Sequence, residues 1–268
     1  MSDSSTAREP RSFRGAFKRE VEAALAASRR DDAQVTTSDV AHLPAAIQRY
    51  LRFTGVIGQP RVWNYRARLS GSFRNGARGP WMNAQVAQRS FVAPMARLFL
   101  IEASMFGLPI AAYHRYVGPE ARFRVRVASL ITVVDAHGPE MNQGETVTMF
   151  NDLCLLAPAT LAFAPIEWLE RDAHTVDARF TNAGHTVGAT MSFDASGGLA
   201  DFVSDDRFMS EDGRVYRRER WSTPVHAWGK FGAFTLPLDC EACWLLAGGP
   251  FPYARFRTEA LDYNDAAP

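Results

Sequence analysis

Apolar and polar residues alternate along most of the chain after residue 58, in runs separated by Gly, Pro, Asn and Asp. The run ARFRVRV, where Phe and Val alternate with Arg, is the clearest example. Such period-two alternation is typical of half-buried β-strands, and short turns between successive strands favour a single antiparallel sheet. The DASGG segment predicts one hairpin, because Gly197 and Gly198 tolerate the positive φ of tight turns.

The residues before this sheet follow a helical pattern. From residue 13 to about residue 30, apolar positions recur at helical spacing opposite a charged face. A second helix is expected between a cap at Ser38 or Asp39 and an end at Gly55. The polar start of the chain is expected to be disordered. The predicted organisation is a tail over 1–12, N-terminal helices over 13–58 and a sheet over 59–268.

One mostly apolar segment, ETVTMFNDLCLLAPATL over residues 145–161, interrupts the alternation. Its head is predicted to be a strand carrying Glu145. Its centre is predicted to start a short helix capped by Asn151 or Asp152, because proline disrupts a central strand. With the helix-like APIEWLERDA that follows, the pattern predicts a helical insertion near 151–172. Nothing local requires a carboxylate at Glu145, so we expect its side chain to point into a cavity.

Composition narrows the class of partner. Of 268 residues, 47% are hydrophobic and 22% are charged, and 30 basic residues nearly balance 29 acidic ones. The near-neutral charge argues against a nucleic-acid binder, and no run approaches the ~20 apolar residues of a membrane helix. The N-terminus lacks the apolar core of a signal peptide, so the expected location is the cytoplasm.

No pattern in the sequence predicts a metal or a cofactor. Cys240 and Cys243 form a C-x-x-C, but residues three apart on a strand point to opposite faces, so both are expected to be free thiols. The sequence contains no histidine cluster with zinc spacing, no P-loop and no G-x-S-x-G. We therefore expect a protein without cofactor or metal.

Several stretches resemble a bacterial family of unknown function, namely LPAAIQRYLRFTGVIG, VVDAHGPEM, ETVTMFNDLCLLAP and the half that runs from FTNAGHTVGATMSFDASGG to ALDYN. In layout, FGAFTLP and the closing ALDYN are also similar to the periplasmic lipoprotein carriers of the LolA and LolB type. In that fold a curved, unclosed barrel wraps partly around helices and a hydrophobic cavity. The predicted fold class is therefore α+β, a curved, unclosed antiparallel barrel of about nine to eleven strands with helices packed on its concave side.

Four residues are candidate acids or bases in such a cavity. Glu145 and Asp152 would meet only if the chain folds back, and an apolar cavity can raise the pKa of a carboxylic acid into the range that acid–base work requires. Asp205 adjoins Asp206, so at most one of the two faces the cavity. His185 lies at a turn into a strand. For each candidate the alternative is a structural role in capping, hydrogen bonding or an ion pair.

Arg207 is the candidate for binding a ligand carboxylate, with an internal ion pair as the alternative. Aromatic residues on the concave face are expected to line a ligand pocket. In addition to Arg207, the ligand-binding candidates are Trp63, Trp221, Trp244 and Tyr263.

The sequence favours the binding of a hydrophobic or amphipathic small molecule in the cavity of an open barrel. The competing hypothesis is a cofactor-independent enzyme, a cyclase, isomerase or hydrolase, that acts on an apolar substrate in the same cavity. The third hypothesis is a structural interaction module. Ionisable groups that converge in the cavity would indicate an enzyme. A cavity without charges would indicate a carrier, and a completely filled core would indicate the interaction module. No nucleic-acid partner and no integral membrane segment are expected, and no oligomeric state is predicted.

Overall fold

The computed structural model describes residues 12–74, 76, 79–105, 107–128 and 130–267. The predicted tail over 1–12 lies outside these residues except for Ser12. The helices are α1 (Phe13–Ala27), α2 (Thr37–Val40), α3 (Ala45–Thr54), α4 (Pro139–Leu156) and the 3-10 helix η1 (Pro158–Ala162). The strands are β1 (Asn64–Phe73), β2 (Met82–Val92), β3 (Met95–Met105), β4 (Leu108–Val117), β5 (Glu120–Val127), β6 (Ile131–His137), β7 (Ile166–Glu170), β8 (Thr175–Asn182), β9 (His185–Phe193), β10 (Leu199–Met209), β11 (Arg217–Ser222), β12 (Val225–Phe231), β13 (Phe234–Leu246) and β14 (Gly249–Tyr263).

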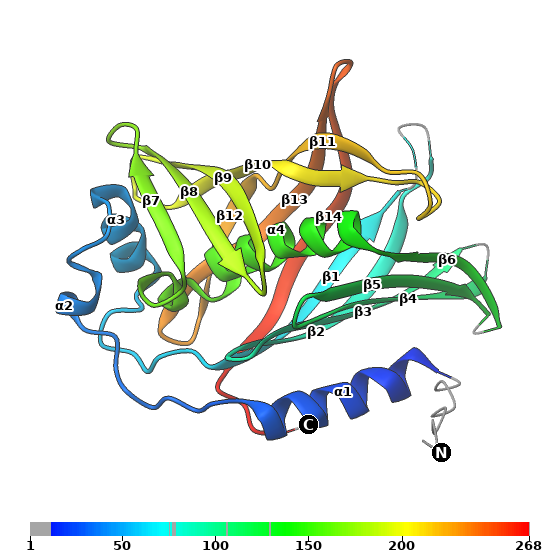
Figure 1. Cartoon of the computed structure of the whole chain (residues 1–268), viewed down its shortest axis with the longest axis horizontal. Coiled ribbons are helices and arrows are strands. Elements are labelled where there is room, and N and C mark those ends of the chain that lie inside the picture. Colours follow the sequence, from blue (N-terminus) through cyan, green and yellow to red (C-terminus); the bar gives the residue numbers. More distant parts are fainter. Residues whose placement is uncertain (1–11, 75, 77–78, 106, 129, 268) are drawn as a thin grey trace.

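The strands of the described residues form one antiparallel sheet that curls into an open half-barrel (Figure 1). Their order is β6-β5-β4-β3-β2-β1-β14-β13-β11-β10-β9-β8-β7, and β12 pairs with β13 beside this path. Because β6 and β7 end the sheet without pairing with each other, the barrel is unclosed. The predicted fold class is confirmed, although the sheet has fourteen strands rather than nine to eleven.

The N-terminal helices form within the predicted ranges, although the expected second helix is divided into α2 and α3. Ser12 caps α1 by accepting a hydrogen bond from the amide of Gly15 at 3.1 Å, and Gly55 ends α3 with a left-handed φ of 77°. The N-cap of α2 is Thr36 rather than Ser38 or Asp39, because Asp39 occupies the third helical position of a capping box.

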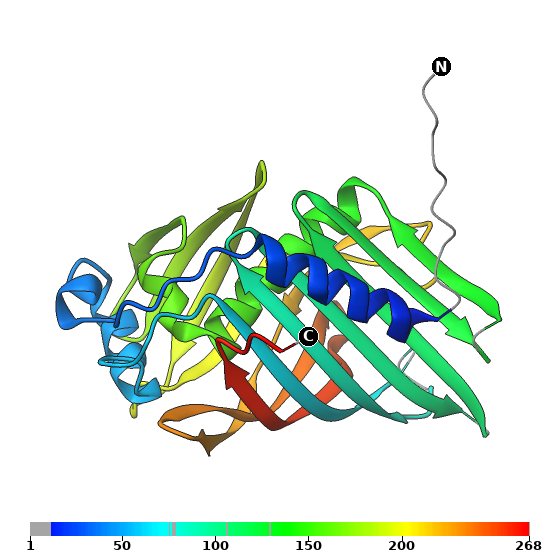
Figure 2. The same ribbon diagram turned by 90° about the horizontal axis from the view of Figure 1, so that it is seen from below.

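The helices lie on both sides of the sheet. α1 crosses the outer face of β2–β4, where Phe13 and Val21 pack against Leu98 and Tyr113 (Figure 2). α4 runs along the concave side, as expected (Figure 1). On β3 and β4 the outer face is therefore covered by α1, while the inner face meets α4 at Arg97, His114 and Tyr116.

The segment ETVTMFNDLCLLAPATL is the main correction to the predicted elements. Glu145 does not lie on a strand, and Asp152 does not cap a helix, because both belong to the 18-residue helix α4. All residues from Gly144 to Leu156 are buried, so this part of the helix has no solvent-exposed face and shows no amphipathic period. Two tyrosines donate hydrogen bonds to its last carbonyls, Tyr50 to Cys154 at 2.6 Å and Tyr263 to Leu156 at 2.5 Å.

The APIEWLERDA stretch is a second correction, since it forms the edge strand β7 and not a helix. The helical insertion therefore occupies α4 and η1, earlier in the chain than 151–172. The DASGG hairpin is confirmed between β9 and β10, with a φ of 91° at Gly197.

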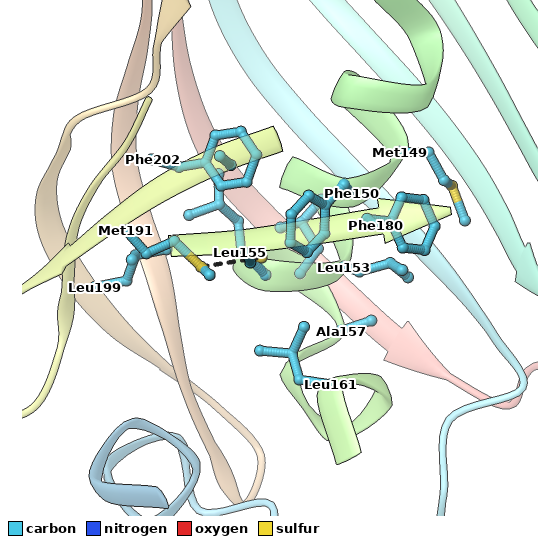
Figure 3. Packing of buried hydrophobic residues seen from close by; sticks show 14 of the residues in the cluster. Met149, Phe150, Leu153, Leu155, Ala157, Leu161, Phe180, Met191, Leu199 and Phe202 are labelled. Carbon is cyan, nitrogen blue, oxygen red and sulfur yellow. Dashed lines mark hydrogen bonds between the residues drawn. The ribbon is translucent and has the colours of Figure 1, made fainter. Parts of the chain in front are cut away.

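The concave side has a filled half and a less covered half. Towards β8–β10, Phe150 of α4 stacks on Phe180 with ring centroids 5.0 Å apart and meets the edge of Phe202 at 5.3 Å (Figure 3). Leu153, Met191 and the residues around them are fully buried there. The inner faces of β3–β6 differ, because most of their apolar side chains are only half-buried.

Candidate functional site

An ion cluster joins α4 to the inner face of the sheet. Glu145 and Asp152 are seven residues apart on α4, which places both carboxylates on one side of the helix two turns apart. Between them lies Arg97 of β3, whose Nε donates to Asp152 Oδ2 at 2.6 Å and whose Nη1 donates to Glu145 Oε2 at 3.4 Å. All three side chains are buried, so the sheet and the helix are joined by charges without access to bulk water.

Four further side chains complete the contacts of the two carboxylates. Arg207 Nη2 of β10 donates to Glu145 Oε1 at 3.4 Å, and Thr148 donates to the same oxygen at 2.9 Å. His114 Nε2 of β4 lies 3.0 Å from it, although its ring is not turned for a good hydrogen bond. Gln88 Nε2 of β2 donates to Asp152 Oδ2 at 2.6 Å. We call Arg97, His114, Glu145, Asp152 and Arg207 the ion cluster.

Two β-bulges aim side chains at this cluster. The pairing of β10 with β11 shifts between Ser204 and Arg207, and the extra residue turns Arg207 to the inside. The pairing of β13 with β14 shifts where Tyr253 is skipped between Pro252 and Ala254, and Tyr253 also reaches inward. The two bulged strands thus bring together residues that strict alternation would separate.

Aromatic residues hold the Arg207 guanidinium. Its Cζ lies 4.3 Å from the ring centre of Trp221 and 5.7 Å from that of Trp244. Tyr253 stacks on Trp244 with ring centroids 5.8 Å apart. The Tyr253 hydroxyl oxygen accepts from Arg207 Nη1 at 3.1 Å and from Trp221 Nε1 at 3.0 Å.

Burial and neighbouring charges act in opposite directions on Glu145. Burial by itself would raise the pKa of Glu145, but the nearby His114, Arg97 and Arg207 lower this pKa to about 2. Burial also lowers the pKa of His114, against the opposing effect of Glu145. At neutral pH the cluster therefore contains an ionised Glu145 and an uncharged His114.

The lowered pKa of Glu145 predicts that acid destabilises the protein. The unfolded chain, with a glutamate pKa near 4.5, takes up a proton that the folded chain binds only near pH 2. The ionised Glu145 therefore contributes about 3 kcal/mol to the free energy of unfolding above pH 4.5. This contribution is lost as the pH falls from 4.5 towards 2. The depressed pKa of His114 acts in the same direction below its ordinary value of 6.5.

Urea unfolding between pH 7 and pH 3 tests this prediction. The free energy of unfolding should fall across the range, and Glu145→Gln should flatten the part below pH 4.5. Circular dichroism without urea serves as the control that each sample starts folded. An equal slope in the variant and in the natural protein would show that other groups cause the acid sensitivity.

The structure brings five of the nine predicted site residues together. Glu145, Asp152 and Arg207 belong to the ion cluster, and Trp221 and Trp244 lie beside Arg207. Glu145 and Asp152 meet through the shared helix face and not through a chain reversal.

The other four predicted residues lie elsewhere. Asp205 is exposed in the β10 bulge, with an Arg220 Nε at 3.7 Å. His185 starts β9 after a turn and pairs with Asn182. Trp63 is buried before β1 beneath Arg30, and Tyr263 lies against the C-terminus of α4. The contacts of these residues give no support for a shared site with Glu145.

Sequence reasoning missed Arg97, His114 and Tyr253. Arg97 and His114 carry a faint signal, because each interrupts the apolar inward positions of a strand, in ARLFLIE and IAAYHRYV. Tyr253 carries none, because only the bulge decides which face it takes. The face of Arg207 depends on a bulge in the same way.

Two hollows lie on the outer face of the sheet. One, of about 610 Å³, spans β7–β11 and is lined by paired charges such as Asp177, Asp206 and Arg218. The other, of about 490 Å³, lies over β1, β2, β13 and β14 beside Gln85 and Arg255. Both have charged walls and differ from the apolar inner face.

Two further properties of the described residues bear on the site. Cys154, Cys240 and Cys243 are free thiols, and within the ranges that the structure covers no group of His, Cys, Asp or Glu is arranged to hold a metal ion. Across those same ranges, none of the helices is both long and apolar enough to span a membrane.

The chain belongs to a family of unknown function, DUF6544, whose pattern matches residues 33–256. This is the family relationship that the C-terminal half and the helical segments suggested. No curated protein matches the chain.

Among solved structures, the chain is similar to a putative outer membrane lipoprotein-sorting protein domain from Vibrio parahaemolyticus, with 9% identity, 76% of this chain and 87% of that chain covered, and a TM-score of 0.42. It is also similar to a DUF1329 family protein from Desulfovibrio piger, with 10% identity, coverages of 88% and 96%, and a TM-score of 0.45. A third is a β-barrel-like DUF1849 protein from Brucella abortus, with 11% identity, coverages of 76% and 99%, and a TM-score of 0.29.

Proposed function

We propose that this protein binds an apolar or amphipathic small molecule against the inner face of β3–β6, next to the ion cluster. The observation that supports the proposal is incomplete burial. Most of the larger inward apolar side chains of these strands are only half-buried, although Phe99 and Tyr116 are buried, whereas the inward side chains of β8 and β9 are all buried. The half-buried inward residues are Ile101, Ile110, Phe123, Val125, Val127 and Val134.

This apolar face begins at the ion cluster. The Phe123 ring lies 4.9 Å from the His114 ring, and the Phe99 ring lies 4.3 Å from Arg97 Cζ. From there the inward positions continue along β5 to Val127. A molecule on this face would have a polar end at the cluster and an apolar body along the strands, which is the usual make-up of a small-molecule site.

Exposed apolar side chains mark the other end of the same half. Leu108 and Ile131 are both exposed. Leu108 begins β4 beside the β3–β4 turn and Ile131 begins β6 beside the β5–β6 turn, so both lie at the end of these strands away from Phe123 and the ion cluster. Apolar side chains that cluster at a surface are typical of a binding region, which here would be the route of entry.

The ion cluster favours binding over catalysis. A general base works best with a pKa near the operating pH, whereas the pKa of Glu145 is lowered to about 2. The Asp152 oxygen Oδ2 is already held by Arg97 and Gln88 at 2.6 Å each. These carboxylates anchor α4 and define the polar end of the proposed site.

A charge on the inner face should weaken binding. We expect the uncharged dye N-phenyl-1-naphthylamine to bind the native protein saturably and Val125→Glu to weaken it by about tenfold or more, because an unpaired carboxylate is costly in an apolar contact. Fluorescence titration measures both.

Gln85→Glu is the matched control, since it adds the same charge on the exposed outer face of β2 beside the smaller hollow. Its affinity for the dye should equal that of the natural protein. The opposite pattern, with Gln85→Glu weakened and Val125→Glu unchanged, would place binding in the outer hollow and contradict the proposal.

A further inference from the structure

We infer that the bound molecule carries an uncharged hydrogen-bond acceptor, such as an ester or ketone carbonyl, and that Tyr253 and Arg207 bind it. This inference rests on the proposed function and adds the chemistry of the ligand's polar end. It follows from two features of the same residues, the donors that they leave unused and the balance of their charges.

The unused groups are donors. The Tyr253 oxygen accepts from two N–H groups, so its own O–H remains to donate, and no described residue accepts from it. Arg207 Nε is buried and has no hydrogen-bond partner among the described residues. A buried donor without an acceptor is costly in a native protein, and an acceptor from a ligand would remove that cost.

The carboxylate that contacts Arg207 already has donors of its own. Both oxygens of Glu145 receive donors, Oε1 from Thr148 and Arg207 and Oε2 from Arg97. A ligand that brings donors, such as an ammonium group, therefore finds no free carboxylate oxygen on Glu145.

The charges of the cluster cancel without a ligand. Arg97 and Arg207 balance Glu145 and Asp152, and burial keeps His114 uncharged at neutral pH by lowering its pKa. A carboxylate would add an uncompensated negative charge beside Glu145, in a region where charges are poorly solvated. A neutral carbonyl meets the donors without disturbing this balance.

Both donors are close to the proposed apolar site. The Arg207 side chain contacts Glu145, which in turn lies 3.0 Å from His114, and His114 packs on Phe123 of the inner face. Tyr253 is half-buried and the Arg207 side chain is 12% exposed, so both side chains are partly accessible, although the Nε atom of Arg207 is itself buried. The two β-bulges are what bring these donors to the inside.

A matched ligand series tests the inference on the unaltered protein at pH 7.5. Methyl decanoate, decanoate and undecane each compete with N-phenyl-1-naphthylamine. The ester and the acid share a ten-carbon acyl chain, and undecane has the same number of carbons as the ester, so the three differ mainly in the polar end. We expect methyl decanoate to displace the dye at a concentration about three- to tenfold lower than either of the others, as one net hydrogen bond allows. Tyr253→Phe should remove this advantage and bring the displacing concentrations of methyl decanoate and undecane together, because the phenyl ring has no O–H to donate.

Each outcome bears on a different claim. If decanoate equals or exceeds the ester, the cluster accepts an anion and the inference is wrong. If all three compete equally, or if Tyr253→Phe keeps the full preference for the ester, no acceptor is bound by Tyr253 and the inference is wrong, while the proposed function stands. If the dye does not bind the native protein at all, the proposed function itself fails. Urea unfolding of Tyr253→Phe controls for a loss of structure.

Discussion

Replacing Arg97 by methionine should lower the free energy of unfolding by about 3–5 kcal/mol, one of the largest effects that a single change can have on this fold. Arg97 is the only described cation that contacts both Glu145 and Asp152. Methionine fills much of the same volume but leaves the two buried carboxylates without their shared cation. An uncompensated buried charge costs far more than the net strength of the ion pair that it has lost.

The matched control is Arg257→Met. Arg257 also lies on a strand and pairs with an aspartate, Asp239 at 2.9 Å, but its side chain is 52% exposed. An exposed pair of this kind contributes about 0–1 kcal/mol. Urea denaturation of both variants at pH 7 measures the difference. A loss below about 1 kcal/mol in Arg97→Met would mean that water reaches the cluster and solvates its carboxylates.

Phe150→Ala should also lower the free energy of unfolding by about 3–5 kcal/mol. Phe150 is fully buried on α4 between Phe180 and Phe202, and it fills the half of the barrel that α4 closes (Figure 3). Alanine would leave a cavity as well as losing apolar burial, because a sheet on one side and a helix on the other have little freedom to collapse.

Phe163→Ala provides the comparison, because Phe163 is 43% exposed just after η1. Its loss should cost less than about 1 kcal/mol. Thermal and urea unfolding should agree for both variants. If Phe150→Ala proves as mild as Phe163→Ala, the concave half at β8–β10 is not a tightly packed core, and the contrast that supports the proposed binding face disappears.

The local pattern of the sequence was sufficient to predict the elements that have one solvent-exposed side and one buried side. α1 has a charged face opposite Phe13 and Val21, and strands such as β1, β8 and β9 alternate because their outer faces meet water. Gly55 and Gly197 marked a helix end and a hairpin, since both positions use a positive φ. The open antiparallel barrel could therefore be predicted from these patterns together with the family resemblance.

The element at the centre of the site could not be predicted in this way. α4 is buried on all sides, so its residues show no period that separates helix from strand. The prediction consequently placed Glu145 on a strand and Asp152 at a cap. Only the fold shows that the two share a helix face and meet Arg97, which is more than 45 positions away from either in the chain.

The sequence by itself determined the types of side chain in this protein: nearly balanced charges, alternating strands, a glutamate and an aspartate within an apolar run, and Arg207 and the tryptophans as separate ligand-binding candidates. The tertiary structure decided which of them meet. One extra residue in β10 and one in β14 reverse the alternation that follows, and these bulges turn Arg207 and Tyr253 inward while Asp205 stays outside. A bulge depends on how a strand pairs with its neighbour. Pairing involves two segments that are distant in the chain, so the sequence of one segment alone does not determine it.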